Sequence, residues 1–506
     1  MSPRHHAPTM RTARALTALG LTLGLTGAAV PVAVAAAKTS AAAPSPAAGN
    51  PWVDRTYRPS PGRWQDYVLA PASRLVEPIS VLAADARQGS FQGDPSAALH
   101  ADGKAVRVVS TGDRTRSPLL TLDFGKELLG KPELTILRSS TPRPKLHVCM
   151  SESKDFMAKS ATQNDGQATH APGCDTANIW NGFPGVPYTY DNDSHALPLN
   201  AATLPGTVRD PQLRGFRYLT VFLDSPGSID LDAVKVAFTA APDQANLRSY
   251  PGHFLSSDNQ LNKIWYAGAY TVQLNTAAAD TAKSWPYTTG EADHADAPVP
   301  HADPAKELIY DGAKRDRIVW QGDLAVQAPV TYLSTGDVSA VDNSLSSLAA
   351  QQLPDGFMPA ESQVGQHNRD ELRTYGEYVT WFINNMSVHY LYTGDKTYLD
   401  RWYPAVTRAM EWLESVRAQD PQGLIGFGSV NSCGHYGYGD CGHETYVNAL
   451  YVRNLHQTAD LARAEGDTGA GAAYAGRADQ VAKNINDQLW DDTTGAYRLS
   501  REIPSA

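Results

Sequence analysis

The sequence predicts an all-β domain followed by a helical domain, and three observations support this fold class. Before about residue 250, short runs of β-forming residues alternate with Gly, Pro and Asp. After it, apolar residues recur with the period of an α-helix. Several of these helices end in a similar glycine-containing turn. We therefore predict a β-sandwich over residues 52–250 and a toroid of helix pairs over residues 251–506, joined near Pro251.

Two segments of different composition precede the β domain. The first part of residues 1–37 carries three arginines, Arg4, Arg11 and Arg14. A Leu/Ala/Val-rich stretch follows, and the segment ends in small residues with A-x-A sites. This pattern predicts a cleaved secretory signal peptide rather than a retained membrane anchor, because Pro31 and the small-residue end favour cleavage. Residues 38–51 are rich in Ala, Ser, Pro and Gly, which predicts a linker. No other apolar run is long enough to span a bilayer, so we expect a secreted protein without membrane contact.

The β domain is predicted from its alternating runs. Gly, Pro and Asp separate the runs, and residues 151–209 are so rich in Asn, Asp, Gly and Pro that long loops are expected there. The predicted strands cover residues 105–110, 119–124, 133–138, 145–150, 218–223 and 228–240.

The helical domain begins after Asp258, which we expect to cap a helix. Its predicted buried stripe carries Leu261, Ile264, Trp265 and Val272, and Gly268 on the same stripe would allow a neighbouring helix to approach closely. Further helices are predicted at about residues 323–335, 339–352, 374–393, 397–418, 444–465 and 470–490.

Three of these helices end alike, at Gly336-Asp337, Gly394-Asp395 and Gly466-Asp467. Glycine just past a helix relieves the left-handed position that ends it. The spacing between these endings is too irregular for a solenoid, so a ring of helix pairs with variable loops fits better. Such a ring is expected to gather its chemistry on those loops.

Composition excludes some classes of partner. The 506 residues carry a formal net charge of −10, with 42% hydrophobic and 19% charged residues. An acidic chain without a basic stripe does not predict a nucleic-acid partner. We predict no cofactor, and a carbohydrate as the substrate, for the reasons given below.

The four cysteines fall into two local pairs, Cys149/Cys174 and Cys433/Cys441. In an exported protein we expect two disulfides, although four cysteines allow three connectivities. A zinc site at the second pair is the alternative, because His435 and His443 lie beside it, but the absence of a C-x-x-C motif disfavours it, and both histidines are equally well explained as pocket or loop residues.

The segment from Asp311 to Asp323 carries the candidate chemistry. It contains three aspartates, two arginines and Trp320 within thirteen residues. Carboxylates transfer protons and bind hydroxyl groups, arginine keeps them ionised, and an indole offers a flat apolar face to a sugar ring. A solvated loop with weak ion pairs is the alternative. The apolar residues inside the segment favour packing and therefore a functional role.

A second aromatic group is predicted to join this site. Trp381 follows Glu377 and Tyr378 by about one turn of a predicted helix. An acidic site with aromatic walls suits a neutral polyhydroxylated ligand better than an anion. The other tryptophans after residue 250 are expected to lie in the helix-packing core.

The charged segment resembles a family signature. Asp311-Gly-x-Lys-Arg315-Asp316-Arg317-x-x-Trp320-x-Gly-Asp323 is similar to the signature of bacterial α-L-rhamnosidases, inverting glycoside hydrolases of family 78 with an (α/α)6 barrel. The similarity extends over roughly residues 115 to 500 through three further stretches: Arg214-Gly-Phe-Arg217-Tyr218, Thr393-Gly394-Asp395 and Glu444-Thr-Tyr-Val-Asn448-Ala-Leu450-Tyr451.

The resemblance implies roles for the matching positions. Asp316 would be the general acid, a position that is often Glu in the family, so its shorter side chain is a departure. Asp311 and Asp323 would bind sugar hydroxyls. Arg315 would orient the carboxylates, and Trp320 would line the pocket. These residues and Trp381 form the predicted substrate site.

The resemblance also implies a second carboxylate. The family's barrel has twelve helices, of which seven are predicted here, and its general base is a glutamate in the remaining part. We therefore expect an incomplete toroid that holds the acid half of the site, with Glu377 and Glu444 as alternative bases. Two other functions stay open: a glycosidase of the same six-hairpin type with another sugar specificity, and a non-catalytic secreted carbohydrate-binding protein.

Overall fold

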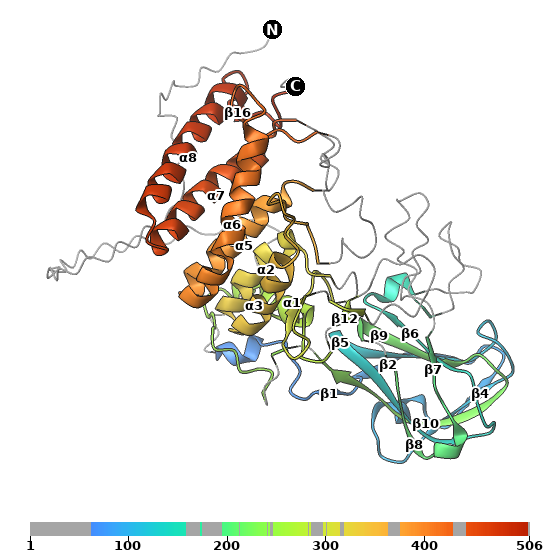
Figure 1. Cartoon of the computed structure of the whole chain (residues 1–506). Helices are drawn as coiled ribbons and strands as arrows, with labels where there is room; N and C mark the ends of the chain where they lie inside the picture. The colour runs from blue at the N-terminus through green and yellow to red at the C-terminus, as the bar shows by residue number, and fades with distance from the viewer. Residues whose placement is uncertain are drawn as a thin grey trace, which may run out of the picture. The chain divides into compact units, whose positions relative to one another are not determined.

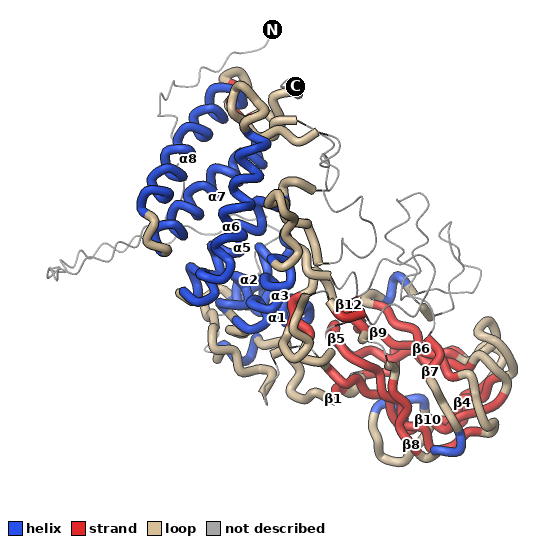
Figure 2. Tube along the Cα trace, viewed as in Figure 1, coloured by secondary structure: helices blue, strands red, loops and turns tan. Residues whose placement is uncertain are grey.

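The computed structural model describes residues 62–157, 173–174, 195–211, 213–239, 241–242, 246–281, 283–284, 297–299, 301–313, 318–362, 375–428 and 442–503. Strands occupy the first half of these residues and helices the second, which confirms the predicted order of a β-rich region followed by a helical region (Figure 2). The predicted signal peptide, the linker and the Cys433/Cys441 pair lie outside the described residues. Within the described ranges, no helix combines the length and apolar character that a membrane crossing requires.

The β-rich region is a ten-stranded sheet built around one long strand, β5 (Figure 1). The strand order is β3-β4-β10-β5-β9-β6-β7, with β1 paired to β10 and both β2 and β8 paired to β5. The strands are β1 (Leu75–Val76), β2 (Ser80–Asp85), β3 (Ser90–Gln92), β4 (Val106–Ser110), β5 (Leu119–Ser139), β6 (Leu146–Ser151), β7 (His195–Leu197), β8 (Gly206–Arg209), β9 (Arg214–Leu223) and β10 (Gly227–Phe238).

Strand β5 corrects the sequence prediction, which had divided it into strands at residues 119–124 and 133–138. Its first part pairs with β2 and β9, and its second part pairs with β10 and β8. The register shifts between Asp123 and Leu128, where Gly125 has a φ of +78° that favours glycine. Gly125, which suggested a break, therefore marks a bulge in one continuous strand, and Pro132 pairs regularly with Val236 of β10.

The Arg214–Tyr218 stretch secures this bulge. Arg217 donates hydrogen bonds from Nε and Nη2 to the two carboxylate oxygens of Asp123, at 2.9 and 3.0 Å. Asp123 also accepts the backbone N–H of Gly125 at 2.6 Å. The hydrogen bond from Arg217 is the main cause that lowers the pKa of Asp123, against a smaller opposing effect of burial. The bidentate pair thus ties β9 to the point where β5 bends.

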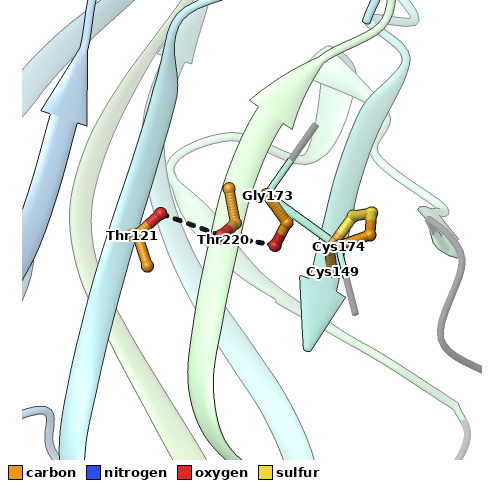
Figure 3. Close-up of a disulfide and its surroundings, with 5 residues drawn as sticks. All are labelled: Thr121, Cys149, Gly173, Cys174 and Thr220. Atoms are coloured by element: carbon orange, nitrogen blue, oxygen red, sulfur yellow. Dashed lines mark hydrogen bonds between the residues drawn. A yellow bond between two sulfur atoms is a disulfide. The ribbon is translucent and has the colours of Figure 1, made fainter. Parts of the chain in front are cut away.

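One predicted disulfide is present. Cys149 on β6 is bonded to Cys174, across 25 residues of sequence, which confirms the local pairing (Figure 3). Beside it, the Thr121 and Thr220 hydroxyls lie 2.9 Å apart, and Thr220 donates to the carbonyl of Gly173 at 3.1 Å. The bond therefore attaches the segment around Gly173 to the buried face of three adjacent strands. Strands β7 and β8 lie inside the stretch 151–209 that was predicted as long loops, so that prediction was wrong for these two short strands.

The helical region contains α1 (Asn259–Asn275), α2 (Gln321–Leu333), α3 (Val338–Ala349), α5 (Tyr378–Thr393), α6 (Lys396–Arg417), α7 (Thr445–Ala464) and α8 (Thr468–Leu489). Its short strand pairs are β11 (Thr276–Ala277) with β14 (Leu308–Ile309), β12 (Lys283–Ser284) with β13 (Ala297–Pro298), and β15 (Trp490–Asp491) with β16 (Ala496–Tyr497). The 3-10 helices belong to the β-rich region: η1 (Trp64–Tyr67), η2 (Pro95–Leu99), η3 (Lys154–Phe156) and η4 (Ala201–Thr203). Each predicted helix is present, with ends shifted by a few residues.

The recurring Gly-Asp pair ends one helix and begins the next. Gly336, Gly394 and Gly466 have φ values of +66°, +63° and +83°, the left-handed conformation expected of glycine at a helix end. The aspartate after each glycine caps the following helix by accepting a backbone N–H, from Ala340, Tyr398 and Ala470 respectively. Two adjacent residues thus fold α2–α3, α5–α6 and α7–α8 into hairpins, as Figure 1 shows for α7 and α8.

Helix α1 corrects a second prediction. Asp258 caps it as expected, by accepting the N–H groups of Gln260 and Leu261 at 2.7 and 3.3 Å. The predicted buried stripe is correct only in part. Val272 is buried and Trp265 packs half-buried against the core, as predicted. Leu261 and Ile264 are 49% and 57% accessible, and no atom lies within 4 Å of a Cβ built at Gly268. The buried face carries residues that share the core of the β region, namely Tyr266, Ala269, Tyr270 and Leu274. The Tyr266 and Tyr270 hydroxyls donate to the carbonyls of Phe254 and Glu127, which allows both tyrosines to be buried and places Leu261 and Ile264 toward solvent.

Candidate functional site

The loop that carries the predicted acid is closed at its ends. The Asp311 N–H donates to the carbonyl of Ile318 at 2.9 Å, and the Ile318 N–H donates to Asp311 Oδ1 at 3.1 Å. Asn275 Nδ2 also donates to the Asp311 carbonyl at 3.1 Å. Arg315 and Asp316 belong to this loop but lie outside the described residues. The structure therefore places the base of the loop, and it assigns Asp311 a loop-closing contact in addition to its predicted role.

Trp320 stands where this loop meets α2. The segment around it pairs with residues 360–362: the Gln321 N–H donates to the Ala360 carbonyl at 2.9 Å, and the Ser362 N–H donates to the Val319 carbonyl at 3.0 Å. These bonds fix Trp320, which is half-buried, opposite the buried Glu361.

The structure places two tyrosines against Trp320 that the sequence analysis did not assign to the site. The ring centroids of Tyr375 and Tyr378 lie 6.3 and 5.8 Å from that of Trp320, and 5.9 Å from each other. Tyr375 has a φ of +65°, a costly conformation for a bulky residue that the surrounding structure must hold in place. Gly322 allows Tyr378 close to α2, since an added Cβ would lie 3.2 Å from its ring. The aromatic wall is thus Trp320, Tyr375 and Tyr378.

The other two predicted binding residues occupy the same ends of their helices. Asp323 lies in the first turn of α2, where the helix dipole favours a carboxylate. Trp381 lies in the first turns of α5 and is half-buried. The starts of α2 and α5 are adjacent through Trp320 and Tyr378, and their ends are adjacent through Tyr332 and Tyr392, whose rings stack at 4.6 Å. The two helices therefore run in parallel, so Asp323 and Trp381 lie at the same end of the helix pair, near the N-termini.

Two buried glutamates complete this end of the helices. Glu377 precedes α5 and is 4% exposed, and Glu444 precedes α7 and is 7% exposed. Burial raises the pKa of Glu377 to about 7, and the charge of Glu444 acts in the same direction, against a hydrogen bond from its own backbone. The two carboxylates, far apart in sequence, are therefore electrostatic neighbours.

We name these residues the acidic-aromatic cluster: Trp320, Asp323, Tyr375, Glu377, Tyr378 and Glu444. A carboxyl with a pKa near neutrality can exist in either protonation state at working pH, as general acid-base chemistry requires. Flat aromatic faces bind the C–H side of a sugar ring. Among the residues that the structure describes, no group of three or more His, Cys, Asp and Glu is arranged to hold a metal ion. The cluster is suited to proton transfer on a neutral hydroxylated ligand.

The tyrosines and Glu361 had weak signals in the sequence. Tyr375 and Tyr378 stand three residues apart at the start of an apolar helical segment, beside the Trp381 that was assigned to the site. Glu361 follows an ordinary loop, and only its pairing with Trp320 reveals it.

Comparison with known proteins agrees with the resemblance stated above. Residues 306–503 match the family described as the bacterial α-L-rhamnosidase six-hairpin glycosidase domain. The structure is similar to a rhamnosidase from Klebsiella oxytoca with rhamnose bound, with a TM-score of 0.58 and 18% identity over 86% of this chain and 74% of that chain. It is also similar to the GH78 family rhamnosidase of Bacillus sp. GL1, with a TM-score of 0.56 and 18% identity over 80% of this chain and 35% of that chain.

No curated protein sequence matches the chain. At 18% identity, the two structural similarities establish a shared fold. The match over residues 306–503 adds the family, and it covers the acidic-aromatic cluster and the signature segment. Residues 306–503 therefore belong to the bacterial α-L-rhamnosidase six-hairpin glycosidase family, which makes the chain a glycoside hydrolase.

Proposed function

We propose that this protein is secreted and hydrolyses terminal α-L-rhamnosyl residues of glycans or glycosides with inversion of configuration. The observation that carries the proposal is the acidic-aromatic cluster, where the starts of three helices bring an aromatic wall and buried carboxylates together in a segment that matches the rhamnosidase domain. The Klebsiella oxytoca protein of similar fold was solved with rhamnose bound, which favours the same sugar here.

In the proposed reaction, Asp316 gives its proton to the leaving oxygen while the bond from the anomeric carbon to that oxygen breaks. A water molecule forms the new bond from the opposite face and loses its proton to a second carboxylate, which in inverting enzymes lies about 6.5–9.5 Å from the first. Glu377 and Glu444 are the candidates for this base among the cluster residues. Of the two, Glu444 is the better candidate at neutral pH, because the raised pKa of Glu377 keeps it partly protonated.

The other predicted site residues would bind the sugar. Asp311 and Asp323 would accept hydrogen bonds from hydroxyl groups, and Arg315 would keep the carboxylates oriented. Trp320 and Trp381 would contact the apolar face of the ring, together with the two wall tyrosines that the structure adds.

We also propose that the helical region forms part of an α/α toroid. Three helical hairpins support it, two of which have parallel first helices, α2 and α5, because such hairpins curve into a ring when repeated. The exposed apolar side chains of α1 and α2 support it as well: Leu261, Ile264, Val326 and Leu333 are 49% to 69% accessible, and a further helix pair of a closed ring would cover them. A crystal structure of the complete gene product with an open helical stack would refute this.

The proposed division is a signal peptide over residues 1–37, a linker over 38–51, a β-sandwich over 52–250 and a catalytic domain from residue 251. Secretion follows from the A-x-A sites, so the mature protein should begin between Ala36 and Ser40. N-terminal sequencing of secreted protein that still contains Arg11 would refute this.

The catalytic role is tested with Asp316→Asn. We expect the variant to lose most turnover of rhamnosides with poor leaving groups, and to lose less with an activated aryl leaving group, which needs little protonation. Equal losses on both substrates would assign the acid role to another residue. Turnover of a different glycoside by the parent protein would favour a six-hairpin glycosidase with another sugar specificity. Glycan binding without turnover would favour a non-catalytic carbohydrate-binding protein.

A further inference from the structure

A network of charged side chains lies directly beside Glu444, outside the acidic-aromatic cluster. His443 Nδ1 lies 2.6 Å from Glu502 Oε1, and the His443 backbone N–H donates to Glu502 Oε2 at 2.9 Å. Arg501 donates from Nη1 to Asp420 Oδ2 at 3.0 Å, and its Nη2 lies 2.8 and 2.9 Å from the two ring nitrogens of His443. We call these four residues the His443 network.

The network gathers three separate segments around the first turn of α7. Asp420 follows α6, His443 precedes α7, and Arg501 and Glu502 follow β16. The last segment also pairs with the start of α7, because the Thr445 N–H donates to the Leu499 carbonyl at 3.0 Å and the Arg501 N–H donates to the His443 carbonyl at 3.2 Å. Glu444 lies between these bonds, opposite the buried Ser500.

Both carboxylates of the network are held in the ionised form. For Glu502, burial alone would raise the pKa, but hydrogen bonds from the backbone and ring of His443 lower it on balance. For Asp420, burial is likewise outweighed by hydrogen bonds from Arg501 and from backbone N–H groups, so its pKa is lowered. Two anions and a guanidinium therefore surround the imidazole, a denser arrangement of charge than one helix start requires.

Two glycines leave the space that the network needs. A Cβ added at Gly426 would lie 2.5 Å from His443 Nε2, and one added at Gly442 would lie 2.2 Å from Glu502 Oε2. Gly442 has a φ of +116°, so glycine is also required there by its backbone. Gly426 has no such backbone requirement, and its role is to admit the imidazole.

We propose that His443 is a positioning residue: with Asp420, Arg501 and Glu502 it holds the first turn of α7 so that Glu444 stays within electrostatic reach of Glu377. This inference rests on the proposed function, in which these two glutamates belong to the reacting site. The network does not touch the sugar. It acts by keeping one carboxylate at a fixed distance from the other, which sets how strongly each resists ionisation of its neighbour.

The titration of Glu377 tests this directly. The free energy of unfolding is measured from pH 5 to 9 for each protein and for the same protein carrying Glu377→Gln. The difference between these two free energies changes with pH as Glu377 titrates, and the midpoint of that titration is read from it. Glu444→Gln should lower the midpoint, because it removes a nearby negative charge. Glu502→Gln and Gly426→Ala should lower it in the same direction, by about 0.5 pH units or more, as Glu444 is released. Combining either with Glu444→Gln should give no further lowering.

The matched control is Glu133→Gln, which breaks an ion pair with Arg209 in the β region and should leave the midpoint unchanged. If Glu502→Gln and Gly426→Ala both lose stability but keep the parent value for the midpoint of the Glu377 titration, the network has only a structural role. An unchanged midpoint in Glu444→Gln would also overturn the inference. Absence of rhamnoside turnover would instead refute the proposed function, and the titration could still be measured.

Discussion

Replacing Glu377 by glutamine should stabilise the protein at high pH. The pKa of this buried carboxyl is about 7, against an ordinary value of 4.5. Between these values the folded state binds more protons than the unfolded state, so the free energy of unfolding falls as pH rises. At about 1.4 kcal/mol per pH unit, ionising Glu377 in the folded protein costs at most about 3 kcal/mol. Glutamine has nearly the same volume and no charge, so Glu377→Gln avoids this cost.

The assay is urea unfolding of the parent and the variant at several pH values from 5 to 9. The stability gained by Glu377→Gln should grow from pH 5 to about pH 7 and then level off, reaching at most about 3 kcal/mol. Glu77→Gln is the control. Hydrogen bonds from Lys235 and His100 are the main causes that lower the Glu77 pKa below 4.5, so the stability lost on its replacement should grow with rising pH only below pH 4.5 and should not follow the rise expected for Glu377→Gln between pH 5 and 7. A difference between parent and Glu377→Gln that is flat with pH, or that falls, would refute the assigned environment of Glu377.

Two further predictions concern stability. Cys149→Ser combined with Cys174→Ser should lower the free energy of unfolding by about 3 kcal/mol, because it releases a 25-residue loop, and equal unfolding midpoints with and without reductant in the parent protein would contradict this. Asp258→Ala should lower the free energy of unfolding by about 1 kcal/mol, since it removes the acceptor for two N–H groups at the start of α1. Asp258→Asn should retain most of the cap. Thermal unfolding compares the three proteins, and an alanine variant as stable as the parent would exclude a capping role.

Local chemistry made much of the helical region predictable. A glycine in the left-handed conformation followed by a capping aspartate needs only two adjacent residues, so the turns at Gly336, Gly394 and Gly466 are encoded where they occur. The cap at Asp258 is equally local. The signature segment also lies within thirteen residues, which is why the glycoside hydrolase family could be identified before any contact was known.

Where two interpretations were locally equivalent, only the tertiary structure decided between them. Helix α1 buries Tyr266 and Tyr270 in the core of the β region, where the Tyr270 hydroxyl donates to the Glu127 carbonyl of β5. The break expected in β5 at Gly125 became a bulge because Arg217, from a distant strand, secures Asp123 there. In both cases the deciding energy comes from partners remote in sequence.

The site shows the same division. Trp320 and Asp323 could be named from their own segment, whereas the wall tyrosines and the meeting of Glu377 with Glu444 depend on three hairpins placing the starts of α2, α5 and α7 together. A carboxyl pKa is set by burial and by neighbouring charge, and neither quantity exists until the chain is folded. The sequence by itself determined the kind of chemistry and the helix ends, because these depend on adjacent residues, and the tertiary structure determined which carboxylates share an environment.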